Sequence, residues 1–179
     1  MTTTVRSLDA LPSMTRRTTE PLVLTQEDIR CLLPMYKPDA VFMREAVLRN
    51  SRLYATFDTF PHPFTRCEPK HLTREHALAF VTQAAYVFAS LMPEHDATWP
   101  VDCSRFQKLS LAEQATFTRI SLHFRRFIRN RGGMRLEIWC DRLRVYRRRI
   151  YGRLRFCFPD GCEGFCDALI ALDGSLVPQ

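Results

Sequence analysis

A cluster of polar side chains stands just before and at the start of the longest run of apolar periodicity in the sequence. It consists of His71, Thr73, Arg74, Glu75 and His76. An imidazole titrates near neutral pH, so it can take a proton in one step and return it in another. An arginine guanidinium can hold a carboxylate through two parallel hydrogen bonds. The cluster therefore predicts a site where proton transfer takes place beside an anion-binding group.

Each of these residues also has an ordinary structural role open to it. His71 is the first candidate for proton transfer, or a helix-entry residue bonded to the backbone, and His76 is the second candidate. Glu75 is expected to orient a histidine or attract an ammonium group, or only to stabilise a helix against its dipole. Arg74 and the distant Arg125 are candidates for binding a carboxylate, or solvated surface residues.

The cluster lies at the start of a predicted helix from Thr73 to Met92. Apolar residues recur there at steps of three and four, which is typical of a buried helix face: Ala77, Leu78, Val81, Ala84, Ala85, Phe88, Leu91 and Met92. Thr73 can cap the first turn, and Pro93 is expected to follow the helix end. The helix would be about 30 Å long. Its positive end would face the polar cluster, so its first N–H groups could stabilise a developing oxyanion.

The other elements are shorter. Residues 25–33 begin with a capping residue and early acids, which predicts a short helix. Residues 41–48 and 52–58 alternate with period two around a turn at Asn50-Ser51, which predicts a hairpin. Ser110 to Glu113 form a capping box for a second short helix, after an irregular stretch to about Val101. Four strands are predicted at about residues 117–128, 134–146, 149–158 and 163–172.

This order of elements excludes a doubly wound parallel sheet and predicts an α+β fold. One antiparallel sheet would be wrapped around one long central helix, with a hairpin before the helix and a meander after it, which is the hot-dog arrangement. Residues 1–24 are rich in threonine and polar, and we expect a flexible tail there. Residues 25–179 would form a single domain, since 179 residues suffice for one sizeable core.

The composition of the chain limits the compartment, the cofactors and the partners that we expect. No apolar run reaches 18 residues and no secretory signal opens the chain, so we expect a cytoplasmic protein without a membrane span. The seven cysteines form no C-x-x-C pair, which favours free thiols in a reducing compartment and predicts no metal site. No cofactor is expected. The net charge of +7 predicts an acidic partner without choosing among nucleic acid, a membrane surface and an acidic carrier protein.

Seven arginines are concentrated in the predicted strands between residues 142 and 155. One interpretation is the outer face of a sheet in water. The other is a docking surface for an acidic carrier protein or for the phosphates of coenzyme A. Nucleic acid is not expected as a partner, because the aromatic residues here follow the alternation of a core and no nucleic-acid-binding motif is present.

Several stretches resemble the FcoT-like hot-dog proteins over about residues 30–173. They are Leu33 to Ala46, His71 to Met92 with Gln83, Ala85 and Tyr86, Phe124 to Arg126, Met134 to Cys140, and Cys157 to Leu172. The family's histidine ahead of the helix matches His71. Its two helix-side asparagines fall at Thr73 and Thr82, and two of its tyrosines fall near Met35 and Thr65.

The resemblance implies an enzyme that acts on acyl thioesters. The reaction that we expect is Michael addition of glycine, or another amine, to the β-carbon of a 2-enoyl thioester, with or without later hydrolysis. Alternatives are a plain thioesterase or dehydratase acting on acyl-CoA or acyl carrier protein, and a non-catalytic module that binds acyl carriers. A hydrolase would usually need a carboxylate, and none is predicted on the apolar side of the helix.

On this interpretation His71, Thr73 and Thr82 are the catalytic candidates. The substrate-binding candidates are Arg74, Glu75, His76, Tyr86 and Arg125, although Thr82 and Tyr86 also fit a role as core polar groups. The partners would be an acyl carrier protein or a coenzyme A thioester, with glycine as co-substrate. Hot-dog units usually pair through their helices and sheets, so we expect a homodimer or a higher homo-oligomer.

Overall fold

A computed structural model describes residues 20–61, 69–130, 132–159 and 161–172. The strands are β1 (Leu22–Leu24), β2 (Met43–Arg49), β3 (Arg52–Phe57), β4 (Ala115–Phe124), β5 (Met134–Tyr146), β6 (Arg149–Phe158) and β7 (Cys162–Ala171). The helices are α1 (Gln26–Leu32), the 3-10 helix η2 (Pro38–Ala40), α2 (Arg74–His95) and α3 (Cys103–Leu111). Most of the predicted N-terminal tail, residues 1–19, lies outside the described residues.

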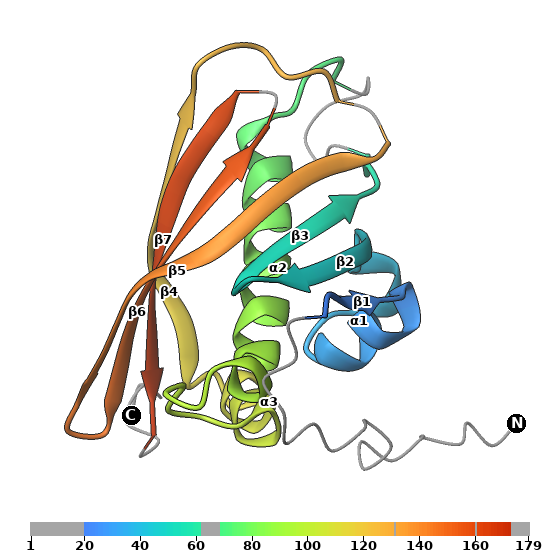
Figure 1. The fold of residues 1–179 in the computed structure, drawn as a ribbon. Coiled ribbons are helices and arrows are strands. Elements are labelled where there is room, and N and C mark those ends of the chain that lie inside the picture. The colour runs from blue at the N-terminus through green and yellow to red at the C-terminus, as the bar shows by residue number, and fades with distance from the viewer. Residues whose placement is uncertain (1–19, 62–68, 131, 160, 173–179) are drawn as a thin grey trace, which may run out of the picture.

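The strands form one antiparallel sheet in the order β1-β2-β3-β5-β6-β7-β4. Helix α2 runs across one face of this sheet, and α1 and α3 lie beside it (Figure 1). The predicted α+β class and the antiparallel sheet are confirmed. The predicted meander of four strands is wrong, because β4 crosses to the far edge and pairs with β7, while β5 pairs with β3. Of the four described strands that follow α2, only β5, β6 and β7 are neighbours in the sheet in the order of the sequence.

Helix α2 begins where the sequence predicted. The Thr73 hydroxyl accepts from the His76 N–H at 3.4 Å, so this residue is the N-cap. The helix continues through Pro93 to His95, one turn beyond the predicted end. Proline has no N–H, so a proline near the helix end removes only one hydrogen bond of the helix. The last turn still closes through the Asp96 N–H, which donates to the Met92 carbonyl at 2.8 Å.

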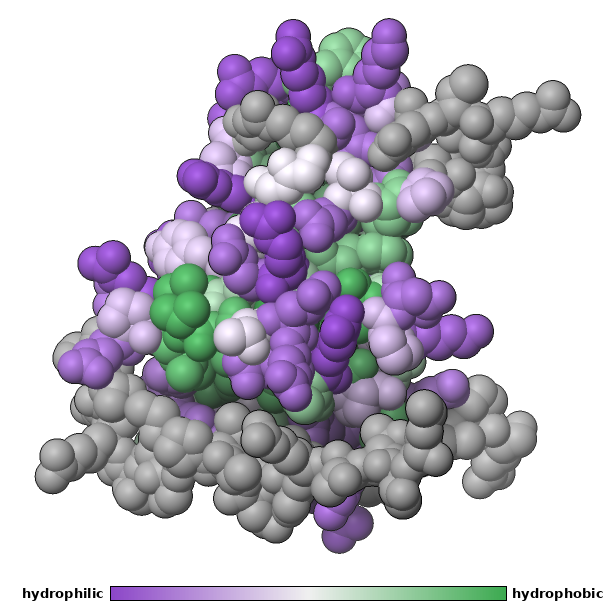
Figure 2. All heavy atoms as spheres, turned by 90° about the vertical axis from the view of Figure 1, so that its right-hand side faces the viewer, coloured by the Kyte–Doolittle hydropathy of each residue, from purple (hydrophilic) through white to green (hydrophobic). Residues whose placement is uncertain are grey.

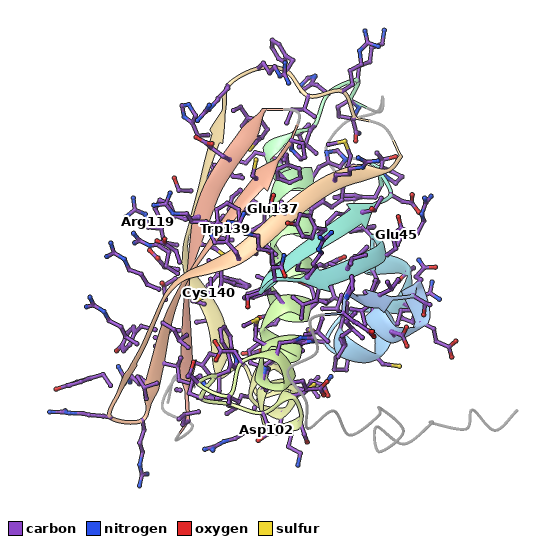
Figure 3. All side chains as sticks on the ribbon, viewed as in Figure 1. Glu45, Asp102, Arg119, Glu137, Trp139 and Cys140 are labelled. Carbon is purple, nitrogen blue, oxygen red and sulfur yellow. The ribbon has the colours of Figure 1, made fainter. Side chains whose placement is uncertain are left out.

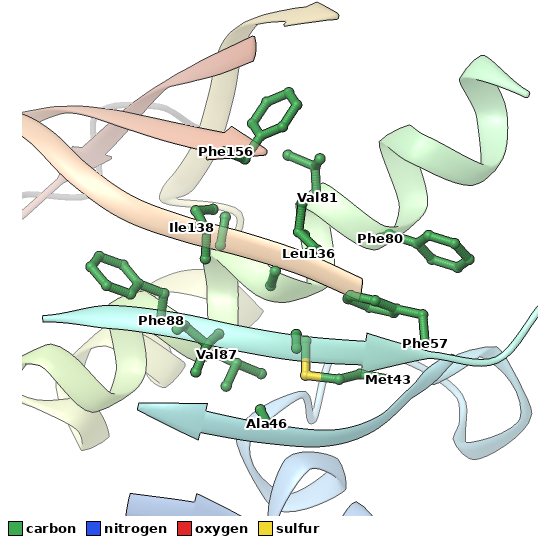
Figure 4. Close-up of a cluster of buried hydrophobic side chains, with 14 of the residues drawn as sticks. Met43, Ala46, Phe57, Phe80, Val81, Val87, Phe88, Leu136, Ile138 and Phe156 are labelled. Atoms are coloured by element: carbon green, nitrogen blue, oxygen red, sulfur yellow. The ribbon is translucent and has the colours of Figure 1, made fainter. Parts of the chain in front are cut away.

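More than half of the α2 residues are buried, and they form the core together with the sheet. Phe80 of α2 stacks on Phe57 of β3 with ring centroids 4.5 Å apart. Figure 4 shows Leu136 and Ile138 of β5 in the same cluster. Burial of such side chains contributes about 1.5–3 kcal/mol each, which is why this helix and sheet stay together.

Gln83 is one of three polar residues of α2 that are buried, with His76 and Ser90. Its side chain is fully buried, accepts from the Phe42 and Met43 N–H groups at 3.0 and 3.2 Å, and donates to the Ala40 carbonyl at 2.7 Å. It therefore holds the segment before β2 against α2.

Other boundaries also differ from the sequence predictions. Leu22–Leu24, assigned to the tail, pair with β2 as β1. The second short helix ends at Leu111 and does not begin near Ser110, because Asp102 is its N-cap and the Ser110 hydroxyl donates to the Phe106 carbonyl one turn earlier. Strand β4 ends at Phe124, four residues before the predicted end. The predicted turn at Asn50-Ser51 is confirmed.

The face that carries α1 and β1 is largely hydrophilic, with smaller hydrophobic patches (Figure 2). Within the described part of the chain, no helix is long and apolar enough to cross a membrane.

Candidate active site

A cleft of about 490 Å³ opens at the start of α2. Two segments that are far apart in the sequence form its walls. They are residues 71–74, at the start of the helix, and residues 124–128, which are the last residue of β4 and the four that follow it. The lining residues are His71, Leu72, Thr73, Arg74, Phe124, Arg125, Arg126, Phe127 and Ile128.

Backbone hydrogen bonds hold the two walls together. The Leu72 N–H donates to the Ile128 carbonyl at 2.7 Å, and the Asn130 N–H donates to the Lys70 carbonyl at 3.1 Å. The side chains of Leu72 and Ile128 are both buried and anchor the walls to the core. This pairing explains why β4 ends early: its predicted continuation leaves the sheet and pairs with the segment before α2.

His71 is exposed on one wall of the cleft. Its ring meets Phe127 edge to face, with centroids 5.6 Å apart. Phe127 is 85% exposed, the most of any large hydrophobic side chain described. An imidazole beside an open aromatic surface can reach a ligand in the cleft, and the phenyl ring offers that ligand an apolar contact.

His76 is placed differently. It is fully buried against Phe60, with ring centroids 4.5 Å apart, and it is not among the lining residues. Its Nε2 lies 2.9 Å from the Phe60 carbonyl, and its Nδ1 lies 2.8 Å from the Thr73 hydroxyl. A carbonyl only accepts, so Nε2 carries the proton and Nδ1 accepts from Thr73. His76 is therefore a positioning residue for Thr73 and does not itself face the cleft.

Three arginines give the cleft a positive character. Arg74 and Arg125 were predicted from the sequence, and Arg126 was not. The side chain of Arg125 forms an ion pair with Glu163 of β7. Among the described lining residues there is no carboxylate, and Glu75 is exposed outside the lining. Together with the positive end of the α2 dipole, these guanidinium groups suit an anionic ligand.

The other two candidates lie elsewhere on α2. The Thr82 hydroxyl donates to the Leu78 carbonyl of the same helix at 2.7 Å. Tyr86 donates to the Ala115 carbonyl at 3.2 Å, and burial raises the pKa of its phenol. Tyr86 lies about 20 Å along the helix from Thr73, at roughly 1.5 Å per residue. The structure thus brings His71, Thr73, Arg74 and Arg125 together, but not Thr82 or Tyr86.

Tyr86 borders a second, apolar pocket of about 40 Å³ between α2, α3 and the sheet. The aromatic side chains that line it are Tyr86, Trp99, Phe106 and Phe117. Its small volume and apolar walls suit a short stretch of hydrocarbon.

Sequence reasoning missed Arg126 and Phe127 as lining residues. The signal was present in the run from Phe124 to Arg129, where aromatic residues are interleaved with arginines. The alternation of this run instead predicts that the strand of residues 117–128 continues through it. A largely exposed phenylalanine beside basic residues is more typical of a ligand contact. Among the described residues, no group of three or more metal-ligating side chains could hold a metal ion.

The sequence matches no protein-family model and no curated protein. The structure, however, is similar to solved ones. A thioesterase from Haemophilus influenzae matches with a TM-score of 0.53 and 12% identity, over 86% of this chain and 96% of that chain. A sigma28-regulated virulence protein from Campylobacter jejuni matches with a TM-score of 0.50 and 9% identity, over 83% of this chain and 99% of that chain.

At these identities the likeness concerns the fold. The chain shares its fold with a thioesterase structure, and this fold fits the hot-dog class that the element order predicted. The narrower resemblance to FcoT-like proteins stays a prediction.

Proposed function

We propose that this protein is an enzyme that acts on acyl thioesters in the cleft at the start of α2. The observation that carries the proposal is the exposed His71 beside the positive end of a long buried helix, in a cleft lined by three arginines. A thioester of coenzyme A or of a carrier protein contains the two groups that this cleft can bind, phosphates and a thioester carbonyl. Its phosphate groups match the guanidinium groups, and its carbonyl oxygen matches a helix N-terminus.

The thioester carbonyl would accept from backbone N–H groups of the first turn. The first N–H groups of a helix have no acceptor within the helix. Thr73 takes the N–H of His76. Of the first two residues of the helix, Arg74 lines the cleft, so its N–H is the donor of this proposal. One donor aimed at a developing oxyanion is typically worth about 3 kcal/mol of transition-state stabilisation.

The reaction that these lining residues suit is addition of glycine to a 2-enoyl thioester. His71 takes a proton from the glycine ammonium group, and the amine then forms a bond to the β-carbon. The electron pair of the double bond moves toward the thioester oxygen, and the enolate is held by the helix N–H donors. His71 then returns the proton to the α-carbon. Arg74 or Arg126 would hold the glycine carboxylate.

Hydrolysis is the second candidate, because the structurally similar protein from Haemophilus influenzae is a thioesterase. In that reaction His71 takes a proton from water while the water oxygen attacks the carbonyl carbon. The C–S bond then breaks, and His71 gives the proton to the leaving thiolate, which releases a thiol and a free acid. The same oxyanion donors would serve both reactions.

Mass spectrometry separates these reactions. The protein is incubated with a 2-enoyl thioester, on coenzyme A and on a carrier protein, with and without excess glycine. Gain of one glycine by the intact thioester supports addition, and release of free acid without glycine supports hydrolysis. Bound but unchanged substrate on both carriers would refute the enzyme proposal in favour of a non-catalytic acyl-carrier-binding module.

We also propose a homodimer or a higher homo-oligomer in the cytoplasm. Strand β4 forms one edge of the described sheet, with β7 on one side only. A second copy paired along β4 would continue the sheet and satisfy its outer backbone groups. Light scattering tests this directly, and a monomer at micromolar concentration would refute it.

A further inference from the structure

The hairpin formed by β5 and β6 ends in a strongly basic tip at the opposite end of the molecule from the cleft (Figure 1). Its exposed arginines are Arg142, Arg144, Arg147, Arg148 and Arg149. No aspartate or glutamate occurs between Asp141 and Asp160. The tip therefore carries a dense positive charge that its own strands do not balance.

Two acids on or beside this hairpin, among the described residues, pair with arginines further up the strands. Asp167 of β7 binds Arg153 through two hydrogen bonds, of 2.6 and 3.0 Å. Asp141 lies 3.4 Å from the guanidinium of Arg155. By contrast, Arg144 and Arg148 form no ion pair with any described residue. Arg144 and Arg148 thus remain available for an anionic partner, and basic side chains project from this end of the sheet into solvent (Figure 3).

Apolar side chains are exposed at the same tip. Val145 is 55% exposed, Tyr146 is 61% exposed and Tyr151 is 42% exposed. The register pairs Arg144 with Tyr151 across the hairpin and Tyr146 with Arg149, so each exposed tyrosine lies beside an arginine of the other strand. A surface that joins exposed aliphatic and tyrosine side chains to arginines has the chemistry of the boundary between lipid headgroups and acyl chains.

The turn itself is unusual. Arg147 and Arg148 are its two residues, and Arg147 has a φ of +55°. Two-residue hairpin turns strongly prefer glycine, asparagine or aspartate where φ is positive. An arginine there costs folding free energy, which is the kind of local strain that occurs at functional positions. Charge at the extreme tip is therefore present despite its conformational cost.

We propose that the tip of the β5–β6 hairpin docks this protein on the surface of an anionic lipid bilayer. Val145 and Tyr146 enter the interface, and the surrounding arginines bind headgroup phosphates. The tip is narrow and projects from the sheet, so it can touch a flat surface without contact from the rest of the molecule. This inference does not depend on the reaction proposed for the cleft.

A nucleic acid fits this tip less well. Binding of single strands relies on aromatic faces that are open to base stacking. The guanidinium of Arg147 lies over the ring of Tyr146, 5.2 Å from its centroid, and occupies that face. The exposed Val145 also has no group that binds a phosphate backbone, whereas it can be buried between lipid headgroups and acyl chains.

Co-sedimentation of the full chain with vesicles tests the proposal. Vesicles of phosphatidylcholine are compared with vesicles in which part of that lipid is phosphatidylglycerol. We expect binding to the second kind only, weakened by salt. The double variant R147Q/R148Q should bind about 25-fold more weakly, since a basic residue near an anionic surface contributes about fivefold. The variant V145S/Y146S, with unchanged charge, should also bind more weakly.

Matched controls lie on the other side of the molecule. Arg30 and Arg49 are exposed, so R30Q/R49Q removes the same charge away from the tip. Val23 is 65% exposed on β1, so V23S removes exposed apolar surface there. Both controls should bind like the wild type. Equal loss in R30Q/R49Q and R147Q/R148Q, no effect of V145S/Y146S, or no binding to anionic vesicles would each overturn the proposal. The proposal would also be overturned if the tip bound an oligonucleotide or an acidic carrier protein but no anionic vesicles.

Discussion

Replacing Gln83 with leucine is expected to destabilise the fold severely although the two side chains are similar in size. The amide of Gln83 is fully buried and serves three backbone groups at once. Its oxygen accepts from the N–H groups of Phe42 and Met43, and its nitrogen donates to the carbonyl of Ala40. Leucine would leave all three groups without this partner inside the core.

The expected loss follows from these contacts. A buried donor or acceptor that loses its partner costs about 1–3 kcal/mol. Three such groups add up to about 3–6 kcal/mol, after allowance for the apolar burial that leucine gains. Domains of this kind are stable by about 5–15 kcal/mol in total. The variant should therefore lose a fifth or more of its stability, with the segment before β2 released from α2.

Equilibrium unfolding in urea measures this loss. Gln107 supplies the matched control, because it is also buried but its side chain makes one hydrogen bond, to the Cys31 carbonyl at 3.3 Å. Gln107→Leu should lose only about 1 kcal/mol. If Gln83→Leu is no less stable than Gln107→Leu, the assignment of Gln83 as the anchor of this segment is wrong.

Three further predictions concern other parts of the chain. Gly164→Ala should lower the unfolding free energy by about 3 kcal/mol or more, since a Cβ there would lie 1.9 Å from the Ser121 carbonyl oxygen; a urea midpoint unchanged from wild type would contradict this. Arg147→Gly should raise stability by about 1 kcal/mol by relieving the positive φ, which thermal unfolding would detect as a higher Tm. Burial raises the pKa of the Cys166 thiol to about 12 and that of Cys162 to about 11, above the ordinary value of 9.0. The neutral thiols are thus favoured by folding, so their stabilisation is complete below pH 9.0 and is lost as pH rises toward 12. Urea titrations at pH 8 to 11 should show a falling unfolding free energy, and Cys166→Ala should make that fall shallower.

The main helix and the strands could be predicted because their signals are local. Thr73 precedes an apolar period of three and four, so both the start and the buried face of α2 were readable from the sequence. The alternation of apolar and polar residues around Leu154 and Phe156 predicts β6 in the same way. Asn50 and Ser51 tolerate positive φ, which fixed the first hairpin turn.

Strand order and the path of residues 125–130 could not be predicted. Alternation indicates a strand but does not identify the strand it pairs with, so β4 was not placed beside β7. Ile128 has the same local signal whether its backbone pairs with β7 or with Leu72, and the structure has the second arrangement. The choice depends on which contacts close the core around α2.

The site was predictable in type but only partly in arrangement. His71 and Arg74 lie in one cleft as their proximity in the sequence suggested. His76 has the same chemistry as His71, but helical geometry turns it inward toward Phe60. Tyr86 lies at the other half of the helix, since separation along α2 becomes distance in space. Arg126 and Phe127 join the site through pairing between distant segments, which no local pattern encodes.

The most direct test of the central claim is the turnover of an acyl thioester by the wild type and by His71→Ala. His123→Ala serves as the control, because His123 is an exposed histidine of β4 outside the cleft lining. Loss of general acid–base catalysis typically costs about 10²–10⁴ in rate. We expect such a loss for His71→Ala, with unchanged substrate affinity and unfolding midpoint, and wild-type turnover for His123→Ala. Equal turnover in all three proteins would contradict it.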